Sequence, residues 1–400
     1  MIKKSILHRI RLRFASNRRA LVPLSDSDGA RNRLVVQRPG TVNWREPEIF
    51  GQGRPLTSFS IQQPELRLSE WIEVSPQAGS DFILPHDEQA AYHPPEFVPK
   101  RDMPMAERFG VIRISRNRVF QYHMEPPVRM GAAVSLLGQC SGNYAHFVTE
   151  VLPRLTVVDK FSEYRKLPLL VDGWMPHESH FSLIRMFGKY KREIIRVGMT
   201  QCADVHRLIT ISPTAYASPE SRSWVERQEL SPLGSTDYRF NISALNNLRE
   251  LALRRSPGRY GRRLFLWRKP PSYGNARNVL ELGKLARAAR RAGFDVIDPA
   301  NMKIEEQIKA FRGARIVVGP SGAALANLVF TPPGCEVVCL AASFEGAEYY
   351  YFSNLMQALG HSIRFVVGPQ EENASGSPMH RSYSIDLGQF NECIASLLNV

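Results

Sequence analysis

Four polar residues recur at helical spacing in the segment Gly142-Asn-Tyr-Ala-His-Phe-Val-Thr-Glu-Val-Leu-Pro-Arg-Leu155: Asn143, His146, Glu150 and Arg154. At about 100° per residue these side chains share one stripe of an α-helix. A histidine and a carboxylate one turn apart suit general-base chemistry, because the carboxylate can orient the imidazole and stabilise its protonated form. The alternative interpretation is a solvent-facing helix surface with Asn143 as the N-cap.

A second candidate site lies in Val317-Val-Gly-Pro-Ser-Gly-Ala-Ala-Leu-Ala-Asn-Leu-Val-Phe330. We expect a buried strand, a turn of small residues at Ser321-Gly322-Ala323, and then a helix. Free amides and the helix dipole at such a turn can bind an anion. The segment lacks the complete dinucleotide-binding glycine fingerprint and the lysine of a P-loop. Taken alone, it is also compatible with an ordinary turn of a doubly wound fold.

Two arginine positions favour a diphosphate ligand near that turn. Arg268 directly follows a predicted strand over 264–267, and Arg277-Asn278 follow the turn-rich loop 270–274. Guanidinium groups at strand ends bind phosphate oxygens by paired hydrogen bonds. The alternative is that these arginines pair with nearby carboxylates.

The formal charge of +14 is concentrated at certain places in the chain. The first twenty residues contain seven Lys and Arg residues and no acidic residue, and Ile6, Leu7, Ile10 and Phe14 fall among them at helical spacing. This pattern predicts a short amphipathic helix on an anionic membrane surface. A transit peptide and an unstructured tail are the alternatives, and the segment lacks the apolar core of a signal peptide.

Composition limits the classes of protein to consider. The chain has 43% hydrophobic and 22% charged residues, enough for globular cores, and no apolar run of about 18 residues that would span a bilayer. Its five cysteines form no Cys-x-x-Cys pair, which favours neither a disulfide framework nor a zinc site and fits a reducing cytoplasm. The cysteines are Cys140, Cys202, Cys335, Cys339 and Cys393.

Hydrophobic periodicity predicts the elements that position these residues. Residues 21–130 are rich in proline and read as an irregular, β-rich preamble packed on the first domain. Strands and helices alternate over 131–213 and again over 264–398, which predicts parallel sheets. The polar stretch 212–246 is the expected connection between the two. In doubly wound sheets ligands lie beyond the carboxyl ends of the strands, where Arg268 and Ser321 are expected.

These motifs together resemble the family 61 glycosyltransferases, a group that includes bacterial capsular-polysaccharide proteins, plant xylan-decorating enzymes and protein O-linked N-acetylglucosaminyltransferases. Family members typically show Asn-Tyr-x-His-Trp followed by Asp-x-Leu-Pro-Arg; this chain has Asn143-Tyr-Ala-His-Phe and Glu150-Val-Leu-Pro-Arg154. Arg268, Arg277 and Gln307 approximately match the next motifs. The last motif, His-Gly-Ala-x-Leu-x-Asn, corresponds to Ser321-Gly-Ala-Ala-Leu-Ala-Asn327.

The resemblance implies an α/β protein with two Rossmann-like domains facing across a cleft, of the glycosyltransferase-B type. The expected division is a basic segment over 1–20, an acceptor-side domain over 21–240 and a nucleotide-sugar-binding domain over 241–400. His146, assisted by Glu150, would be the catalytic base of an inverting displacement, with Asn143 and Arg154 on the acceptor side. The implied donor-binding residues are Arg268, Arg277, Asn278, Gln307, Ser321, Gly322, Ala323 and Asn327.

The expected partners are a nucleotide-sugar donor and a glycan or lipid-linked saccharide acceptor, in capsule-, exopolysaccharide- or lipopolysaccharide-type biosynthesis. We expect no metal ion, no cofactor and no nucleic acid, and a cytoplasmic location with peripheral contact to an anionic membrane. Two positions depart from the family pattern: Ser321 replaces its histidine, and Cys339 replaces a glutamate. A non-catalytic nucleotide-sugar or glycan-binding protein is therefore the alternative function.

Overall fold

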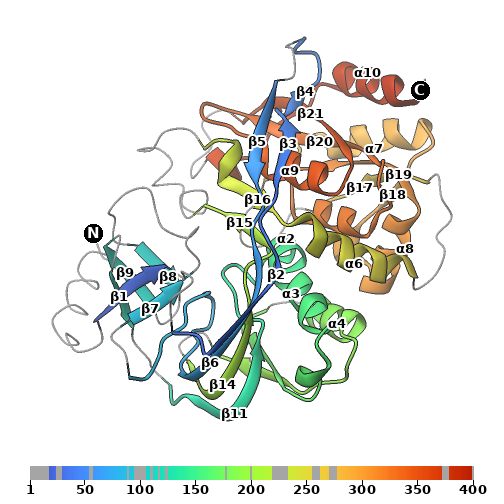
Figure 1. Ribbon diagram of the computed structural model, residues 1–400. Helices are drawn as coiled ribbons and strands as arrows, with labels where there is room; N and C mark the ends of the chain where they lie inside the picture. The colour runs from blue at the N-terminus through green and yellow to red at the C-terminus, as the bar shows by residue number, and fades with distance from the viewer. Residues whose placement is uncertain are drawn as a thin grey trace.

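The computed structural model describes residues 18–23, 29–53, 57–87, 90–93, 105–108, 111–115, 118–121, 125–175, 178–198, 201–218, 233–254, 262–269, 277–371 and 378–398. The predicted loop 270–274 and residues 1–17 of the predicted amphipathic segment lie outside these ranges. The described part is a mixed α/β structure with two six-stranded sheets, connected by helices and by long strands that run between them (Figure 1).

The first six-stranded sheet has the order β13-β12-β11-β14-β6-β2. Its parallel part comes from the region where the sequence alternates strands and helices, whereas β6 and β2 add to one edge in the antiparallel sense. Strand β12 is buried at all its positions, as expected where both faces of a sheet are covered. The strands are β2 (Asn32–Gln37), β6 (Leu66–Val74), β11 (Val128–Ser135), β12 (Leu169–Asp172), β13 (Ile194–Val197) and β14 (Ala203–Ile211).

The helical segments of this half begin after β11. The helix predicted from the spacing of Asn143, His146, Glu150 and Arg154 is divided into α2 (Tyr144–His146), a π-helical turn η3 (Phe147–Val151) and α3 (Leu152–Val158). A 3-10 turn, η4 (Ser162–Tyr164), follows, and α4 (Glu178–Phe187) connects β12 to β13.

The second six-stranded sheet, in the order β18-β17-β19-β20-β21-β4, pairs all of its neighbours in parallel. Gly319 is needed here because a Cβ atom at this position would lie 2.7 Å from the Leu266 side chain on the adjacent strand. The strands are β4 (Glu48–Ile49), β17 (Arg262–Leu266), β18 (Asp295–Ile297), β19 (Ala314–Pro320), β20 (Glu336–Ser343) and β21 (Ser362–Pro369).

The helical elements around the second sheet are α7 (Leu282–Arg291), η7 (Pro299–Asn301), α8 (Ile304–Arg312), η8 (Ala323–Phe330), α9 (Tyr350–Ala358), η9 (Pro378–His380) and α10 (Leu387–Leu398). Five of these elements lie where the sequence indicates helices, the segment after β19 is a 3-10 helix, and the short turns η7 and η9 were not predicted.

The N-terminal region extends over both sheets, which corrects the expectation that it packs on the first half alone. After β2, the chain forms β3 (Thr41–Arg45), adds β4 to the edge of the second sheet and returns through β5 (Ser58–Gln62). Gln357 of α9 fixes this crossing: its Oε1 accepts from the Arg45 N–H at 2.6 Å, and its Nε2 donates to the Arg45 carbonyl at 2.9 Å.

A separate five-stranded sheet has the order β7-β1-β10-β9-β8. Its strands are short, as the frequent prolines of this region lead one to expect. They are β1 (Arg18–Pro23), β7 (Ala90–His93), β8 (Met105–Arg108), β9 (Val111–Ser115) and β10 (Arg118–Gln121).

The predicted connection over 212–246 is structured where it is described. Strands β15 (Ala215–Ala217) and β16 (Tyr238–Phe240) pair with each other, with the 3-10 turn η6 (Ser235–Asp237) before β16. Helix α6 (Ile242–Arg254) follows and buries Leu245 and Leu248 between α3 and η8. One hydrophobic cluster therefore continues from the first half through α6 into the second.

Among the helices of the described ranges, none is both long and apolar enough to cross a membrane.

Candidate active site in the cleft

A proline shapes the helix that carries the candidate base. Pro153 has no N–H, and its ring excludes the normal approach of the carbonyl four residues earlier, on Thr149. The chain responds with the π turn, in which the Leu152 N–H donates to the Phe147 carbonyl five residues earlier. Such π turns are rare and occur often at functional sites.

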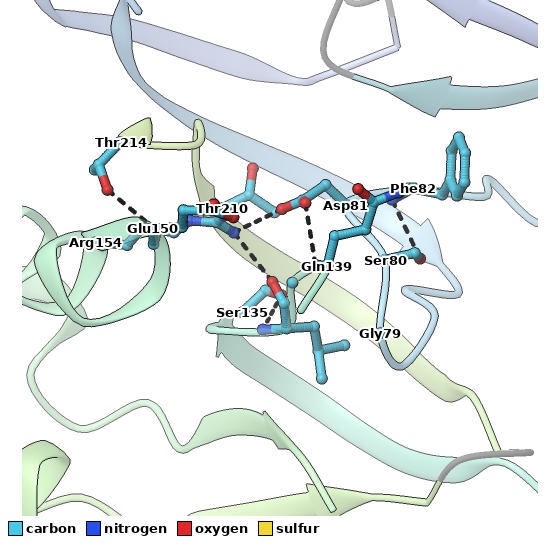
Figure 2. Close-up of polar contacts among 12 residues, drawn as sticks. Gly79, Ser80, Asp81, Phe82, Ser135, Gln139, Glu150, Arg154, Thr210 and Thr214 are labelled. Carbon is cyan, nitrogen blue, oxygen red and sulfur yellow. Dashed lines mark hydrogen bonds and ion pairs between the residues drawn. The ribbon is translucent and has the colours of Figure 1, made fainter. Parts of the chain in front are cut away.

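Side chains donate hydrogen bonds to the backbone carbonyls that the interrupted helix leaves without a helical N–H partner (Figure 2). The Thr214 hydroxyl donates to the Thr149 carbonyl at 2.8 Å and contacts the Glu150 carbonyl at 3.1 Å. The Arg154 Nε donates to the same Glu150 carbonyl at 2.8 Å. These bonds offset the cost of buried backbone groups and fix the position of Glu150.

His146 and Glu150 form a close pair on this helix. The His146 Nδ1 lies 2.5 Å from the Glu150 Oε1, and the exposed fractions of the two side chains are 19% and 3%. A carboxylate at Nδ1 favours the tautomer that has its proton on Nδ1, so Nε2 is the basic nitrogen. The Tyr351 ring packs on the imidazole, with 5.5 Å between ring centroids. The pair therefore has the geometry that a general base requires.

The His146 ring lines a cavity of about 360 Å³ between the two halves of the molecule. Asn143 lines the same cavity from the N-cap of α2, where its side chain accepts from the Ala145 N–H at 3.0 Å. Predicted donor-binding residues also line this cavity, namely Arg277, Ser321, Gly322 and Ala323. The structure thus brings the predicted base and part of the predicted anion site to one cavity.

Aromatic and acidic residues that the sequence reasoning missed complete this cavity. Tyr351 and Glu348 line it, and Glu348 accepts a hydrogen bond from the Tyr238 hydroxyl at 2.6 Å. The run Tyr349-Tyr-Tyr351 at the start of α9 was the available signal, because consecutive tyrosines supply flat surfaces with polar ends.

Arg268 contacts the Ser321–Ala323 turn but does not line the cavity. Its Nη1 donates to the Ser321 carbonyl at 3.3 Å, and a Cβ atom at Gly322 would approach that nitrogen to 3.1 Å. Glycine therefore allows the guanidinium to reach the turn. Burial lowers the pKa of Arg268 below its usual value.

The two positions that depart from the family motifs are neighbours. The Ser321 N–H donates to the carbonyl of Leu340, the residue after Cys339, at 2.8 Å, and burial raises the pKa of the Cys339 thiol to about 12. Cys339 is therefore a neutral, unreactive group at neutral pH, in place of the charged carboxylate of the family pattern.

Gln307 and Asn327 are buried, and a series of hydrogen bonds links them to Tyr144. The Asn327 Nδ2 donates to the Gln307 Oε1 at 3.0 Å, and the Tyr144 hydroxyl donates to the Asn327 Oδ1 at 2.5 Å. This series ties α2 to η8 and α8, and neither amide lines the cavity. Asn278 also lies outside the lining, and its backbone carbonyl accepts from the Tyr383 N–H at 2.9 Å.

Arg154 is placed away from the His146 cavity. Its Nη1 forms an ion pair with Asp81 at 2.7 Å and donates to the Leu137 carbonyl at 3.0 Å (Figure 2). The predicted polar stripe is thus divided: His146 faces the cleft, and Arg154 lines a second cavity.

Groups of three or more His, Cys, Asp and Glu side chains arranged to hold a metal ion do not occur within the described ranges.

Comparison with known families identifies the class of protein. The family model described as Glycosyltransferase 61 matches residues 144–338, which include His146, Glu150, Arg268, Arg277 and the Ser321–Ala323 turn. This match confirms the resemblance based on the motifs: the matched region belongs to glycosyltransferase family 61, and the family indicates a glycosyltransferase. No curated protein matches the chain.

Proposed function

We propose that the protein transfers a sugar from a nucleotide-sugar donor to a glycan acceptor, with inversion at the anomeric carbon. The observation that carries this proposal is His146, which is paired with the buried Glu150 and lines the same cavity as Arg277 and the Ser321–Ala323 turn. A base and an anion-binding turn at one cavity are the two groups that a single displacement needs.

The proposed reaction is one concerted step. An acceptor hydroxyl attacks the anomeric carbon while the bond between that carbon and the diphosphate oxygen breaks. The hydroxyl proton passes to His146 Nε2, and Glu150 stabilises the imidazolium that forms. The departing diphosphate takes the electron pair, and its charge is stabilised by Arg277, Arg268 and the turn amides. These groups would do this without a metal ion.

The remaining assignments follow from the family and from charge. The two sheets would be the Rossmann-like halves of a glycosyltransferase-B arrangement, with the donor on the second half and the acceptor on the first. A capsule-, exopolysaccharide- or lipopolysaccharide-type glycan, or its lipid-linked precursor, is the proposed acceptor. The basic N-terminal segment would bring the enzyme to an anionic cytoplasmic membrane surface.

The donor side can be tested by nucleotide binding. Arg268→Ala should weaken nucleoside diphosphate binding by roughly 1.5–3 kcal/mol, the range for a hydrogen bond to a charged group. Calorimetry with a panel of nucleotides and nucleotide sugars measures this change. The matched control is Arg287→Ala, the same change at an exposed position of α7. Equal affinity of Arg268→Ala and wild type would refute the donor assignment.

Turnover and stereochemistry test the reaction. NMR of the product made from an α-linked donor should show a β linkage, and chelation of divalent metals should leave turnover unchanged. A retained anomeric configuration would exclude single displacement.

The alternative candidate is a non-catalytic nucleotide-sugar or glycan-binding protein. The buried Cys339 thiol favours it, because an un-ionised thiol stands where the family pattern has a carboxylate. Such a protein would bind the nucleotide sugar with Arg268-dependent affinity and produce neither transfer nor hydrolysis.

A further inference from the structure

A second cavity, of about 250 Å³, lies at the carboxyl ends of β11 and β14, next to the loop that holds Asp81. Ser135 and Ile211, the last residues of these two strands, both line it. The carboxyl ends of parallel strands are where α/β sheets bind ligands.

The charges around this cavity are balanced in pairs. The Arg154 Nη1 lies 2.7 Å from the Asp81 Oδ1, with exposed fractions of 4% and 7% for the two side chains. At the other end, the Arg67 Nη2 lies 2.6 Å from the Glu65 Oε1. Each cation is neutralised, so the cavity has no excess charge to attract a phosphate or carboxylate.

The remaining lining favours a ligand with many hydroxyl groups. Ser69 and Thr210 are cross-strand partners on β6 and β14 and both line the cavity. Together with the two ion pairs they supply hydrogen-bond donors and acceptors, whereas Tyr216 supplies an aromatic wall. The volume is slightly below the roughly 300–1,000 Å³ of pockets for drug-sized ligands, which suits a single sugar ring.

This cavity adjoins the cleft. Tyr216 lines the second cavity and the next residue, Ala217, lines the cleft cavity, both on β15. Arg154 provides another connection, because its Nε holds the Glu150 carbonyl while its Nη1 pairs with Asp81 at the cavity (Figure 2). A group bound here would lie beside the element that carries the candidate base.

We infer that the cavity is a subsite for one neutral monosaccharide unit of the acceptor, set apart from the unit that reacts. The acceptor role rests on the proposed glycosyltransferase function, whereas the binding of a neutral sugar does not require turnover. A nucleotide would be disfavoured here because its diphosphate needs uncompensated positive charge.

Ligand-observed saturation-transfer NMR with methyl glycosides tests the binding. The neutral probes are the methyl β-glycosides of glucose, xylose and N-acetylglucosamine, and methyl β-glucuronide is the anionic control. At least one neutral probe should bind wild type, and the glucuronide should bind on the order of tenfold more weakly, equivalent to one uncompensated charge contact. Failure of every neutral probe to bind, or equal binding of the glucuronide, would overturn the inference.

Two variants locate the binding. Ser69→Ile fills the cavity and should lower affinity for the neutral probe at least about tenfold. Ser58→Ile is its control, the same change at an exposed position of β5. Glu65→Gln leaves Arg67 without its carboxylate and should shift selectivity toward the glucuronide. If Ser69→Ile binds like the control, or Glu65→Gln keeps wild-type selectivity, the sugar does not occupy this cavity.

The acceptor role has its own readout. In the transferase assay, Ser69→Ile should raise KM for the acceptor and leave hydrolysis of the donor by water unchanged. If wild type transfers the sugar and Ser69→Ile has the same KM for the acceptor, the subsite is overturned and the proposed function is left intact. Neutral-sugar binding in a protein that neither transfers nor hydrolyses would support the sugar site and overturn the proposed function.

Discussion

The interrupted helix contributes to two ionic pairs, His146–Glu150 and Arg154–Asp81, which differ in exposure and in the chemistry that they allow. His146 and Glu150 lie at the cleft, where the histidine keeps an exposed fraction of 19% and lines a cavity with the predicted anion site. Arg154 and Asp81 are almost completely buried and join the helix to a distant loop. The first pair can exchange a proton with a ligand. The second pair contains an arginine, which does not give up its proton, so it can only hold structure or bind.

The π turn and Pro153 separate these two pairs. In a regular α-helix, residues four apart share one face, and His146, Glu150 and Arg154 would form a single stripe. The five-residue turn changes that progression and leaves carbonyls that Arg154 and Thr214 then satisfy. Because of Pro153, His146 and Glu150 remain at the cleft, whereas Arg154 turns away and supports the fold.

Removal of the cleft pair should have the largest effect. His146→Ala should lower turnover by about 10²–10⁴-fold, the usual contribution of general-base catalysis, while nucleotide affinity stays nearly constant. Glu150→Gln should also be damaging, and the double variant should lose much less than the product of both losses, because the two residues act as a unit. Steady-state kinetics and calorimetry measure these effects. Near-normal turnover in both single variants would show that the pair is only structural.

Removal of the Arg154 guanidinium tests whether the buried Arg154–Asp81 pair supports the fold. Arg154→Met leaves the Asp81 carboxylate buried without its partner and should cost about 3–5 kcal/mol of unfolding free energy. Urea denaturation measures the loss. The exposed pair of Arg185 and Glu178 is the control, and Arg185→Met should cost no more than about 1 kcal/mol. Similar small losses in both variants would contradict a supporting role for Arg154.

The separation itself can be tested at the proline. Pro153→Ala restores a backbone donor and should favour regular α-helical bonding, which returns Arg154 to the face of His146 and Glu150 and shifts the Glu150 carboxylate from its present position. A misplacement of about 1 Å can cost roughly 10²-fold in rate, whereas the unfolding free energy should stay equal or rise. Kinetics combined with denaturation distinguish the two effects, with Pro333→Ala, at an exposed position outside both cavities, as control. Full turnover in Pro153→Ala would mean that the π turn is not required.

A smaller effect is expected at Asp172, which holds the loops beside both pairs. Its carboxylate accepts from the Gly79 N–H at 2.7 Å and the Gly138 N–H at 3.1 Å, and burial raises its pKa from 3.8 to about 7. Because the folded state keeps the proton that the unfolded state loses, the unfolding free energy should fall as pH rises between these two values. Relative to Asp172→Asn, the wild-type Tm should decrease from pH 4 to pH 7. A constant difference would contradict the shift.

The sequence predicted the parallel regions because buried strands and amphipathic helices leave strong periodic signals there. The prediction missed α6 because its asparagines and charged residues made the segment look like a polar connection, although the helix buries Leu245 and Leu248. The route of β4 into the second sheet was also beyond prediction, because two residues of edge strand carry no pairing information.

For the site, residue types and motif order located His146, Glu150, Arg277 and the Ser321 turn. The assumption of a regular α-helix could not show where Arg154 points. The interruption at Pro153 leaves a carbonyl that is bonded by Thr214, which is distant in sequence. Likewise, Asn327 and Gln307 match motif positions, but their amides are engaged with each other, a fact that only the packing of η8 on α8 reveals.

The crossing of the N-terminal region between sheets has a consequence for synthesis on the ribosome. Arg45 and Gln357, which bond each other, are 312 residues apart in sequence, and β4 pairs with β21 at a similar separation. The early segment must therefore wait until almost the whole chain has been made before its partners exist. During that interval β4 and the Arg45 backbone lack their later partners, and such late, non-local pairing slows folding and invites association between nascent chains.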